Sequence, residues 1–170
     1  QIACLNEDID EYEQYIAALF ETHPERDLFD ALPGAGDALA PRLLVAMGTD
    51  RERFDAADEV ATFSGIAPVT ERSGQHTWIH WRLACSKFLR QTFHEFANMS
   101  RHQSPWANAY YEMQRARGKS HHAALRALAF KWIRIIYHCW KQQEVYDEAQ
   151  YLTSLEKRNS PLIKWLPEAA

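Results

Sequence analysis

The sequence predicts a mainly α-helical protein with one short β-hairpin, and three observations support this fold class. Apolar residues recur at steps of three and four through most of the chain, as on the buried face of a helix. Asp or Ser precedes several of these segments and Gly follows them, which are helix start and stop signals. Alternation with a period of two is confined to residues 66–81. The 170 residues, of which 46% are hydrophobic, suffice for one compact domain with a core.

The first predicted element is an amphipathic helix over residues 2–20. Its apolar positions follow a heptad-like spacing and its opposite face is acidic, which is typical of the end of a longer coiled coil. The apolar positions are Ile2, Leu5, Ile9, Tyr12, Ile16 and Leu19.

A helix-hairpin-helix is predicted next, from "DLFDALPGAGDALAPRLLVAMG". After a short helix and a Leu-Pro-Gly-Ala-Gly turn, the second helix is expected to start with Asp37 as N-cap and to end near Gly48. Gly34 and Gly36 permit positive φ, which would bring backbone N–H groups out toward a phosphate, and Arg42 lies one turn further on. An ordinary helical corner that needs glycines is the alternative.

A third short helix and the β-hairpin follow. The stretch "FDAADEVATFSG" predicts a helix capped by Asp55 and ended by Gly65. After it, "IAPVT" and "HTWIHW" are expected to be strands on either side of "ERSGQ". Ser73 therefore falls in the predicted turn.

Three helices are expected to form a C-terminal bundle. The first covers residues 83–99, the second starts at Ser104-Pro105 and ends at Gly118, and Ser120 caps the third, which runs to about residue 141. The third is apolar over a wide arc and is expected to be central. We assign residues 26–146 to this domain and residues 147–170 to a tail that either wraps around it or dangles.

The net charge of −4 hides an uneven distribution. Residues 1–64 carry 4 Lys/Arg against 15 Asp/Glu, whereas residues 65–141 carry 12 against 3 and hold seven of the eight His. A basic middle of this kind is a candidate polyanion surface, since Lys and Arg supply most of the affinity for phosphates. A dipolar, solvated surface is the alternative.

Composition also narrows the class of protein. No apolar run approaches the roughly 18 residues that span a bilayer, and the acidic start differs from a secretory signal. Cys4, Cys85 and Cys139 are widely spaced, which favours neither a disulfide framework nor a zinc site. We expect that the protein does not associate with membranes and that it is located in a reducing cytoplasm. Because the sequence starts with Gln1 and not with an initiator Met, we also expect it to be a piece of a longer protein.

Ser73 has two interpretations. Ser-Gly is a common turn dipeptide, and a hydroxyl is a poor nucleophile unless a base, a metal or strong electrostatics activates it. Against this, Arg72 offers a positive charge and Gly74 allows close approach, as transfer of a phosphate would need. Taken alone, the residue types favour a turn.

The ordered set of motifs resembles the C-terminal transposase domain of the insertion-sequence one-hundred-ten family, also called the IS116/IS902 type. The likeness covers roughly residues 28–146. The motifs that carry it are the Leu-Pro-Gly-x-Gly hairpin, Phe54 with its helix, "FSGIAPV", Ser73-Gly74, Leu89-Arg90 and "YYEMQRARGKSHHAALRALAFK".

This resemblance implies a DNA transposase or recombinase guided by a structured RNA. Its members have an N-terminal RuvC-like domain with four acidic metal ligands, a coiled-coil connector and this C-terminal domain. Ser73 matches the nucleophile that forms a phosphoserine intermediate, in an active site composed between subunits. Residues 1–22 would be the end of the connector, through which a homo-oligomer is expected. Mg²⁺ is expected on the missing RuvC-like domain and no cofactor on this chain, so the fragment alone should be inactive.

The resemblance and the charges together predict a set of nucleic-acid contacts. Where the family usually has a basic stretch after Ser-Gly, this chain has His and Trp, with nearby Arg and Lys as substitutes. The DNA- or RNA-binding candidates are Gly34, Gly36, Arg42, Arg72, Gly74, Arg82, Lys87, Arg90, Arg117 and Lys119. A further cluster, which either holds a nucleic-acid backbone or is merely solvated, is Arg115, Arg117, Lys119, Lys131 and Arg134.

Other residues have less specific interpretations. His76 and His80 share a strand face, but no third metal ligand with suitable spacing is visible. Trp78 and Trp81 either stack on nucleic acid or, as we favour, pack the hairpin on the helices. Two other functions remain open: a non-catalytic helix-hairpin-helix binding module and a helical oligomerisation domain.

Overall fold

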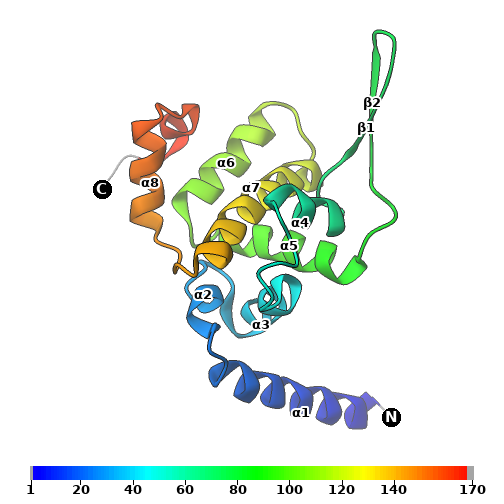
Figure 1. The fold of residues 1–170 in the computed structure, drawn as a ribbon, viewed down its shortest axis with the longest axis vertical. Helices are drawn as coiled ribbons and strands as arrows, with labels where there is room; N and C mark the ends of the chain where they lie inside the picture. The colour runs from blue at the N-terminus through cyan, green and yellow to red at the C-terminus, as the bar shows by residue number, and fades with distance from the viewer. Residues whose placement is uncertain (1, 168–170) are drawn as a thin grey trace.

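Helix α7 forms the centre of a mainly helical protein. The computed structural model describes residues 2–167 (Figure 1). Its elements in chain order are α1 (Ile2–Glu21), α2 (Arg26–Asp30), α3 (Gly36–Met47), α4 (Ala57–Phe63), β1 (Val69–Ser73), β2 (His76–His80), α5 (Lys87–Ser100), α6 (Pro105–Ala116), α7 (His121–Gln142), α8 (Glu148–Lys157) and the 3-10 helix η1 (Pro161–Trp165). The predicted fold class is confirmed.

Three buried tryptophans tie the other elements to α7. Trp132 and Trp140 lie on α7 and Trp106 on α6, and all three side chains are fully buried. The rings of Trp106 and Trp132 are 4.6 Å apart between centroids. Each indole N–H has an acceptor: Trp132 donates to Ser100 Oγ at 2.8 Å, Trp106 to Tyr146 Oη at 2.7 Å and Trp140 to the Gly48 carbonyl at 2.6 Å. The core therefore buries large aromatic surface without leaving these polar groups unsatisfied.

The turn between α2 and α3 packs tightly against the end of α5. Gly34 has φ +82°, and a Cβ at this position would lie 2.7 Å from the Met99 carbonyl carbon. Its backbone N–H donates to Gln103 Oε1 at 2.9 Å. Gly36 has φ +53°, with open space around its Cβ position. The first glycine thus serves packing as well as the turn.

Gly34→Ala is expected to lower the free energy of unfolding by about 2–5 kcal/mol. About 1–2 kcal/mol comes from the left-handed backbone and about 1–3 from the overlap with α5. Gly36→Ala is the matched control, because it shares the positive φ but not the contact. Urea denaturation measures both, and equal losses in the two variants would contradict the packing role.

Local hydrogen bonds correct three predicted helix starts. Helix α3 begins at Gly36 after Ala35, so Asp37 lies in its first turn and is not the N-cap. Helix α4 follows Ala56, and the backbone N–H of Asp55 donates to Glu59 Oε2 at 2.8 Å, so Asp55 is not the cap either. The carboxylate of Glu59, in the first turn of α4, thus accepts a hydrogen bond from the backbone that precedes the helix and performs part of the capping.

The largest shift is at α5, which starts at Lys87 and not at residue 83. Ser86 is its N-cap and accepts a hydrogen bond from the Leu89 N–H at 3.3 Å. Leu83 precedes the helix and is 84% exposed. By contrast, Ser104 and Ser120 cap α6 and α7 as predicted.

The C-terminal segment wraps around the domain. Helix α8 buries Leu155, and η1 buries Leu162 and lies beside α6. Tyr146, in the connection from α7, is also buried. Of the two alternatives for residues 147–170, wrapping holds for the part that the structure describes.

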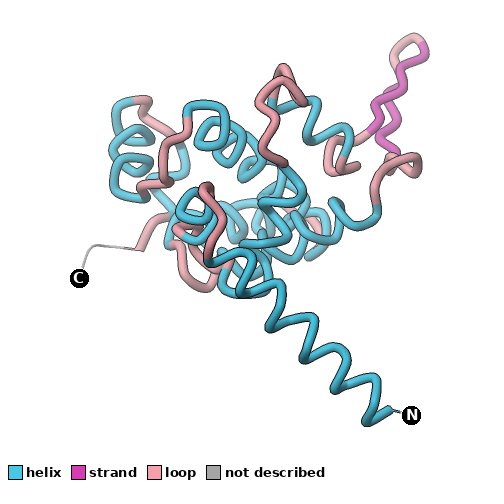
Figure 2. The backbone as a smooth tube through the Cα atoms, turned by 60° about the horizontal axis from the view of Figure 1, so that its bottom comes forward, coloured by secondary structure: helices cyan, strands magenta, loops and turns pink. Residues whose placement is uncertain are grey.

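Helix α1 and the hairpin extend from the helical body in different directions (Figure 2). The predicted apolar seam of α1 faces solvent, with Leu5 60% and Ile16 48% exposed. Phe20, near its end, is partly buried against the core. No helix in residues 2–167 is both long and apolar enough to cross a membrane.

Candidate nucleic-acid interface

Ser73 lies at the tip of a projecting β-hairpin, residues 69–80, which we call the arm (Figure 1). The strands are antiparallel, with Val69 opposite His80 and Ser73 opposite His76. Strand β1 therefore extends through "ERS", and the turn is only Gly74-Gln75, shorter than predicted. Gly74 has φ +59°, as tight two-residue hairpin turns require, because such turns match the twist of the strands.

The register divides the arm into two faces. Directly opposite residues share a face, so Ser73 and His76 lie with Glu71 and Trp78. Arg72 pairs with Thr77 on the other face. The arginine that the sequence offered as a charge beside Ser73 thus belongs to the opposite side of the arm.

The face that carries Ser73 is aromatic and exposed. The His76 ring stacks on Trp78 with centroids 5.8 Å apart, and His80 Nε2 lies 3.3 Å from Glu71 Oε2. Trp78 is 48% exposed, so the expectation that it packs the hairpin on the helices is wrong. No group of three metal-ligating side chains occurs among residues 2–167, and within them no hydrogen bond involves the Ser73 hydroxyl.

Arg90 anchors the base of the arm. Its guanidinium donates to the Arg82 carbonyl and contacts Cys85 Sγ. Gly65 completes this contact, since a Cβ there would lie 2.5 Å from Cys85 Sγ. Arg90 was predicted to bind nucleic acid, and the structure places its side chain, partly buried, where it holds the segment after β2 on α5.

Trp81 packs at the same place, as the sequence favoured. The guanidinium of Arg126, from α7, lies 3.8 Å from the centre of its ring, and that of Arg90 lies 5.8 Å away. Arginine stacked on an indole is attracted to the negative face of the ring. Arg126 therefore links the arm to the start of α7.

A cluster of Lys, Arg and His side chains, which we call the basic face, lies where α5, the end of α6 and the start of α7 meet. On α5 the spacing of three, four and seven residues places its cations on one side of the helix. The charges of His121, His122, Arg126 and Arg90 all act on His94, and those of Arg101 and Arg115 act on His121. The basic face consists of Lys87, Arg90, His94, Arg101, Arg115, Arg117, Lys119, His121, His122 and Arg126.

The basic face is not neutralised from within. Among the described residues, none of its Lys or Arg side chains forms a salt bridge. Burial lowers the pKa of His94, and the positive charges of His122 and Arg126 lower it further. Tyr111 Oη lies 2.8 Å from His121 Nδ1, which orients that ring. The surface therefore has a strong preference for anions.

The nucleic-acid contacts predicted in the helix-hairpin-helix are, with one exception, engaged in contacts within the protein. Arg42 pairs with Glu95 and lies over the Phe88 ring at 5.6 Å, so it docks α3 on α5. The N–H of Gly34 is occupied by Gln103, while Gly36 is exposed at the start of α3. The helix-hairpin-helix is formed, and only its second glycine faces open space.

Several residues of the basic face were not selected from the sequence. His94 and Arg126 lie on long helices rather than in recognisable turns, and Arg101 is the C-cap of α5. Lys87, Arg117 and Lys119 were selected and are exposed as expected. The helical spacing of Lys87, Arg90 and His94 would have revealed the α5 part of the surface.

Comparison with known proteins finds similar sequences among the proteins of insertion elements. Residues 26–112 match the family described as "Transposase IS116/IS110/IS902 family". The chain is 29% identical over 146 residues to the mini-circle IS117 protein of Streptomyces coelicolor, an alignment that covers 86% of the chain and 35% of that protein. It is 34% identical over 138 residues to the 43.6 kDa protein of insertion element IS110 from the same organism, covering 79% of the chain and 33% of the relative.

A mycobacterial relative extends the comparison. The chain is 27% identical over 150 residues to the 42 kDa protein of insertion element IS900 from Mycobacterium paratuberculosis, covering 88% of the chain and 38% of that protein. The chain thus spans about a third of the length of these curated relatives. The family match covers half of the chain and includes the helix-hairpin-helix, the arm and α5. The predicted resemblance is therefore confirmed, and the chain belongs to the IS116/IS110/IS902 transposase family.

Proposed function

We propose that this chain is the nucleophile-bearing part of a transposase, and that Ser73 attacks a DNA phosphate. The observation that carries the proposal is the position of Ser73, at the exposed tip of an arm whose base adjoins the basic face. Such an arm can reach a phosphate of a duplex held on that face. It can equally enter a site formed by another domain or subunit.

The reaction is a transesterification. A bond forms between Ser73 Oγ and phosphorus, the bond from phosphorus to one sugar oxygen breaks, and that oxygen leaves with a proton. The hydroxyl proton passes to a base. We propose that this base and Mg²⁺ come from a RuvC-like domain outside the chain, where the metal would stabilise the charge on the phosphate. His76, opposite Ser73, orients the tip by its stacking on Trp78.

The remaining elements have matching roles. The basic face binds the DNA backbone, because its exposed cations Lys87, Arg117 and Lys119 form no salt bridge with any described residue and can replace counterions on phosphates. The exposed seam of α1 continues into a coiled coil that joins two copies of the chain, which places the arm of one copy near the metal site of another. A structured guide RNA supplies sequence recognition, since backbone contacts carry no base information.

The test is covalent trapping by a full-length protein that contains this segment. A DNA substrate that cannot be religated should leave a protein–DNA adduct, and mass spectrometry should locate the phosphate on Ser73. A nucleotide attached to any other residue would refute the assignment.

Binding of duplex DNA is expected to strengthen as the pH falls from 7.5 to 6. Burial and positive neighbours hold the pKa values of His94 and His121 below their ordinary value, so both rings are largely neutral at pH 7.5. A bound phosphate favours the charged ring and raises these pKa values, so binding takes up protons and gains affinity at lower pH. Fluorescence anisotropy at constant ionic strength measures this dependence.

The double variant His94→Gln and His121→Gln should flatten the pH profile. His23→Gln is the control, because His23 lies in the turn between α1 and α2, away from the basic face. An unchanged profile in the double variant would show that other groups take up the protons.

A further inference from the structure

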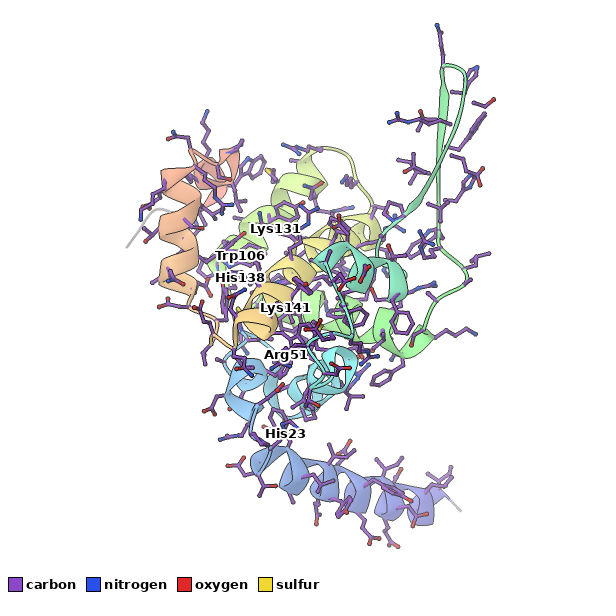
Figure 3. All side chains as sticks on the ribbon, viewed as in Figure 1. His23, Arg51, Trp106, Lys131, His138 and Lys141 are labelled. Atoms are coloured by element: carbon purple, nitrogen blue, oxygen red, sulfur yellow. The ribbon has the colours of Figure 1, made fainter. Side chains whose placement is uncertain are left out.

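A groove of about 990 Å³ runs between α7 and α8. Helix α8 and the arm lie on opposite sides of α7 (Figure 1), so the groove is distinct from the Ser73 arm. None of the residues of the basic face lines the groove. Figure 3 labels Lys131 and His138 along α7, and both side chains line the groove. The polar and aromatic side chains that matter here are Tyr110, Lys131, Arg134, Tyr151, Ser154 and Arg158.

Three cations meet at one end of the groove. Lys131 and Arg134 come from α7, and Arg158 follows the last residue of α8. Burial lowers the pKa of the Lys131 ammonium, and the charges of Arg158 and Arg134 lower it further. Among residues 2–167, neither Lys131 nor Arg158 forms a salt bridge, and Arg134 pairs only with the exposed Asp58, at 3.2 Å. Repulsion within this group is relieved when an anion binds.

Arg158 is already oriented for such an anion. Its Nε donates to the Ser154 carbonyl at 2.9 Å and its Nη2 to Ser154 Oγ at 2.9 Å. These bonds hold one edge of the guanidinium against α8 and leave Nη1 available. A side chain ordered in advance loses less entropy when it binds.

The acidic lining residues belong to the other end of the groove. Glu144 and Asp147 lie in the connection that follows α7, whereas Lys131 lies about three turns before the end of α7, beside Tyr151. Asp147 is engaged as the N-cap of α8, accepting a hydrogen bond from the Gln150 N–H at 3.0 Å. The groove is therefore polarised, with its positive end at Arg158.

Aromatic rings flank the cations. Lys131 Nζ lies 5.0 Å from the centre of the Tyr110 ring and 5.8 Å from that of Tyr151. Phe130 and Ile135 add apolar lining. The groove is larger than a single inorganic anion needs, and its mixture of cations and aromatic rings is the chemistry by which proteins hold unpaired bases with their phosphates.

We propose that the groove between α7 and α8 binds an unpaired nucleotide segment, with phosphates at Lys131, Arg134 and Arg158 and a base or sugar against Tyr151. The choice of nucleic acid as partner rests on the proposed function. The site itself is additional to it, and it gives the chain a second contact on the side away from the arm. A single-stranded DNA and a looped RNA share this chemistry.

The experiment measures binding of the 170-residue chain to labelled 15-mers of single-stranded DNA, single-stranded RNA and duplex DNA by fluorescence anisotropy. Arg158→Gln is expected to weaken single-strand binding about 5- to 10-fold and to reduce the salt slope by about 0.7, as loss of one phosphate contact to a single strand does. Lys157→Gln is the matched control: it removes the same charge from the neighbouring residue, which does not line the groove. Tyr151→Leu should weaken single-strand binding about 5- to 100-fold, through lost stacking.

The outcomes separate the two proposals. If Arg158→Gln and Tyr151→Leu lose more affinity for single-stranded RNA than for single-stranded DNA, the bound segment is RNA; if they lose more for DNA, it is DNA. Either result supports the site. Equal effects of Arg158→Gln and Lys157→Gln, or no single-strand binding by the parent chain, would overturn it. Those outcomes would leave the proposed function intact, because it is tested separately by duplex binding and by DNA adducts on Ser73. Conversely, Arg158-dependent binding together with adducts on another residue would keep the groove and refute the nucleophile.

Discussion

Replacement of Ser73 by Ala in the full-length protein is expected to abolish the covalent protein–DNA adduct. Removal of a nucleophile takes away the only atom that can form the bond, and losses of at least about 10³-fold in rate are usual. The arm is exposed on both faces, so the substitution leaves no cavity and the melting temperature should be unchanged. Trapping on a suicide DNA substrate, followed by denaturing electrophoresis, measures the adduct directly.

Thr77→Ala is the matched control for this experiment. Thr77 is another exposed hydroxyl of the arm, but the register places it opposite Arg72, on the face away from Ser73. Adduct formation should survive in this variant. If Thr77→Ala is as inactive as Ser73→Ala, the arm acts through its shape; if Ser73→Ala still forms adducts, the nucleophile lies elsewhere.

The double variant Arg117→Gln and Lys119→Gln is expected to weaken duplex DNA binding about 10- to 100-fold. Both side chains are exposed on the basic face, so each contact released should reduce the salt slope by about 0.9. The loss should be uniform across sequences, because contacts to phosphates carry no base information. Titrations of the chain with duplex DNA at several salt concentrations give both quantities.

Lys157→Gln with Lys164→Gln controls for net charge. This pair lies in α8 and η1, neither of which contributes a residue to the basic face, and removes the same two charges from the chain. Its effect on duplex binding should stay below about 3-fold, since exposed charges beyond a Debye length are screened. Equal losses in the two double variants would mean that overall charge, rather than the basic face, attracts DNA.

The proposed assembly gives different roles to the acidic helix α1 and to the basic face. Helix α1 contains acidic residues and neither Lys nor Arg, and it extends from the body away from the arm (Figure 2). Its negative charge disfavours DNA, so a duplex is directed to the basic face. Its exposed seam is then available for association with a second chain.

Local sequence signals determined most of the secondary structure. The helix α7 was predicted from a Ser cap and an apolar stripe, and the hairpin from its alternation and its Ser-Gly turn. Side chains and backbone within a few residues of one another decide such features. The errors also concern local features: α3 and α4 follow Ala35 and Ala56 instead of the expected caps Asp37 and Asp55, and α5 starts after Ser86 instead of at residue 83.

Tertiary structure decided what the charged residues do. The sequence by itself determined the family, the helical class and the exposed Ser73 hairpin, because these depend on ordered motifs and short-range hydrogen bonds. It could not distinguish Arg42, paired with Glu95, from Arg117, which is exposed, nor foresee that Arg126 would lie on Trp81. Such contacts join residues far apart in the chain, and the packing of α5 on α7 brings them together or holds them apart.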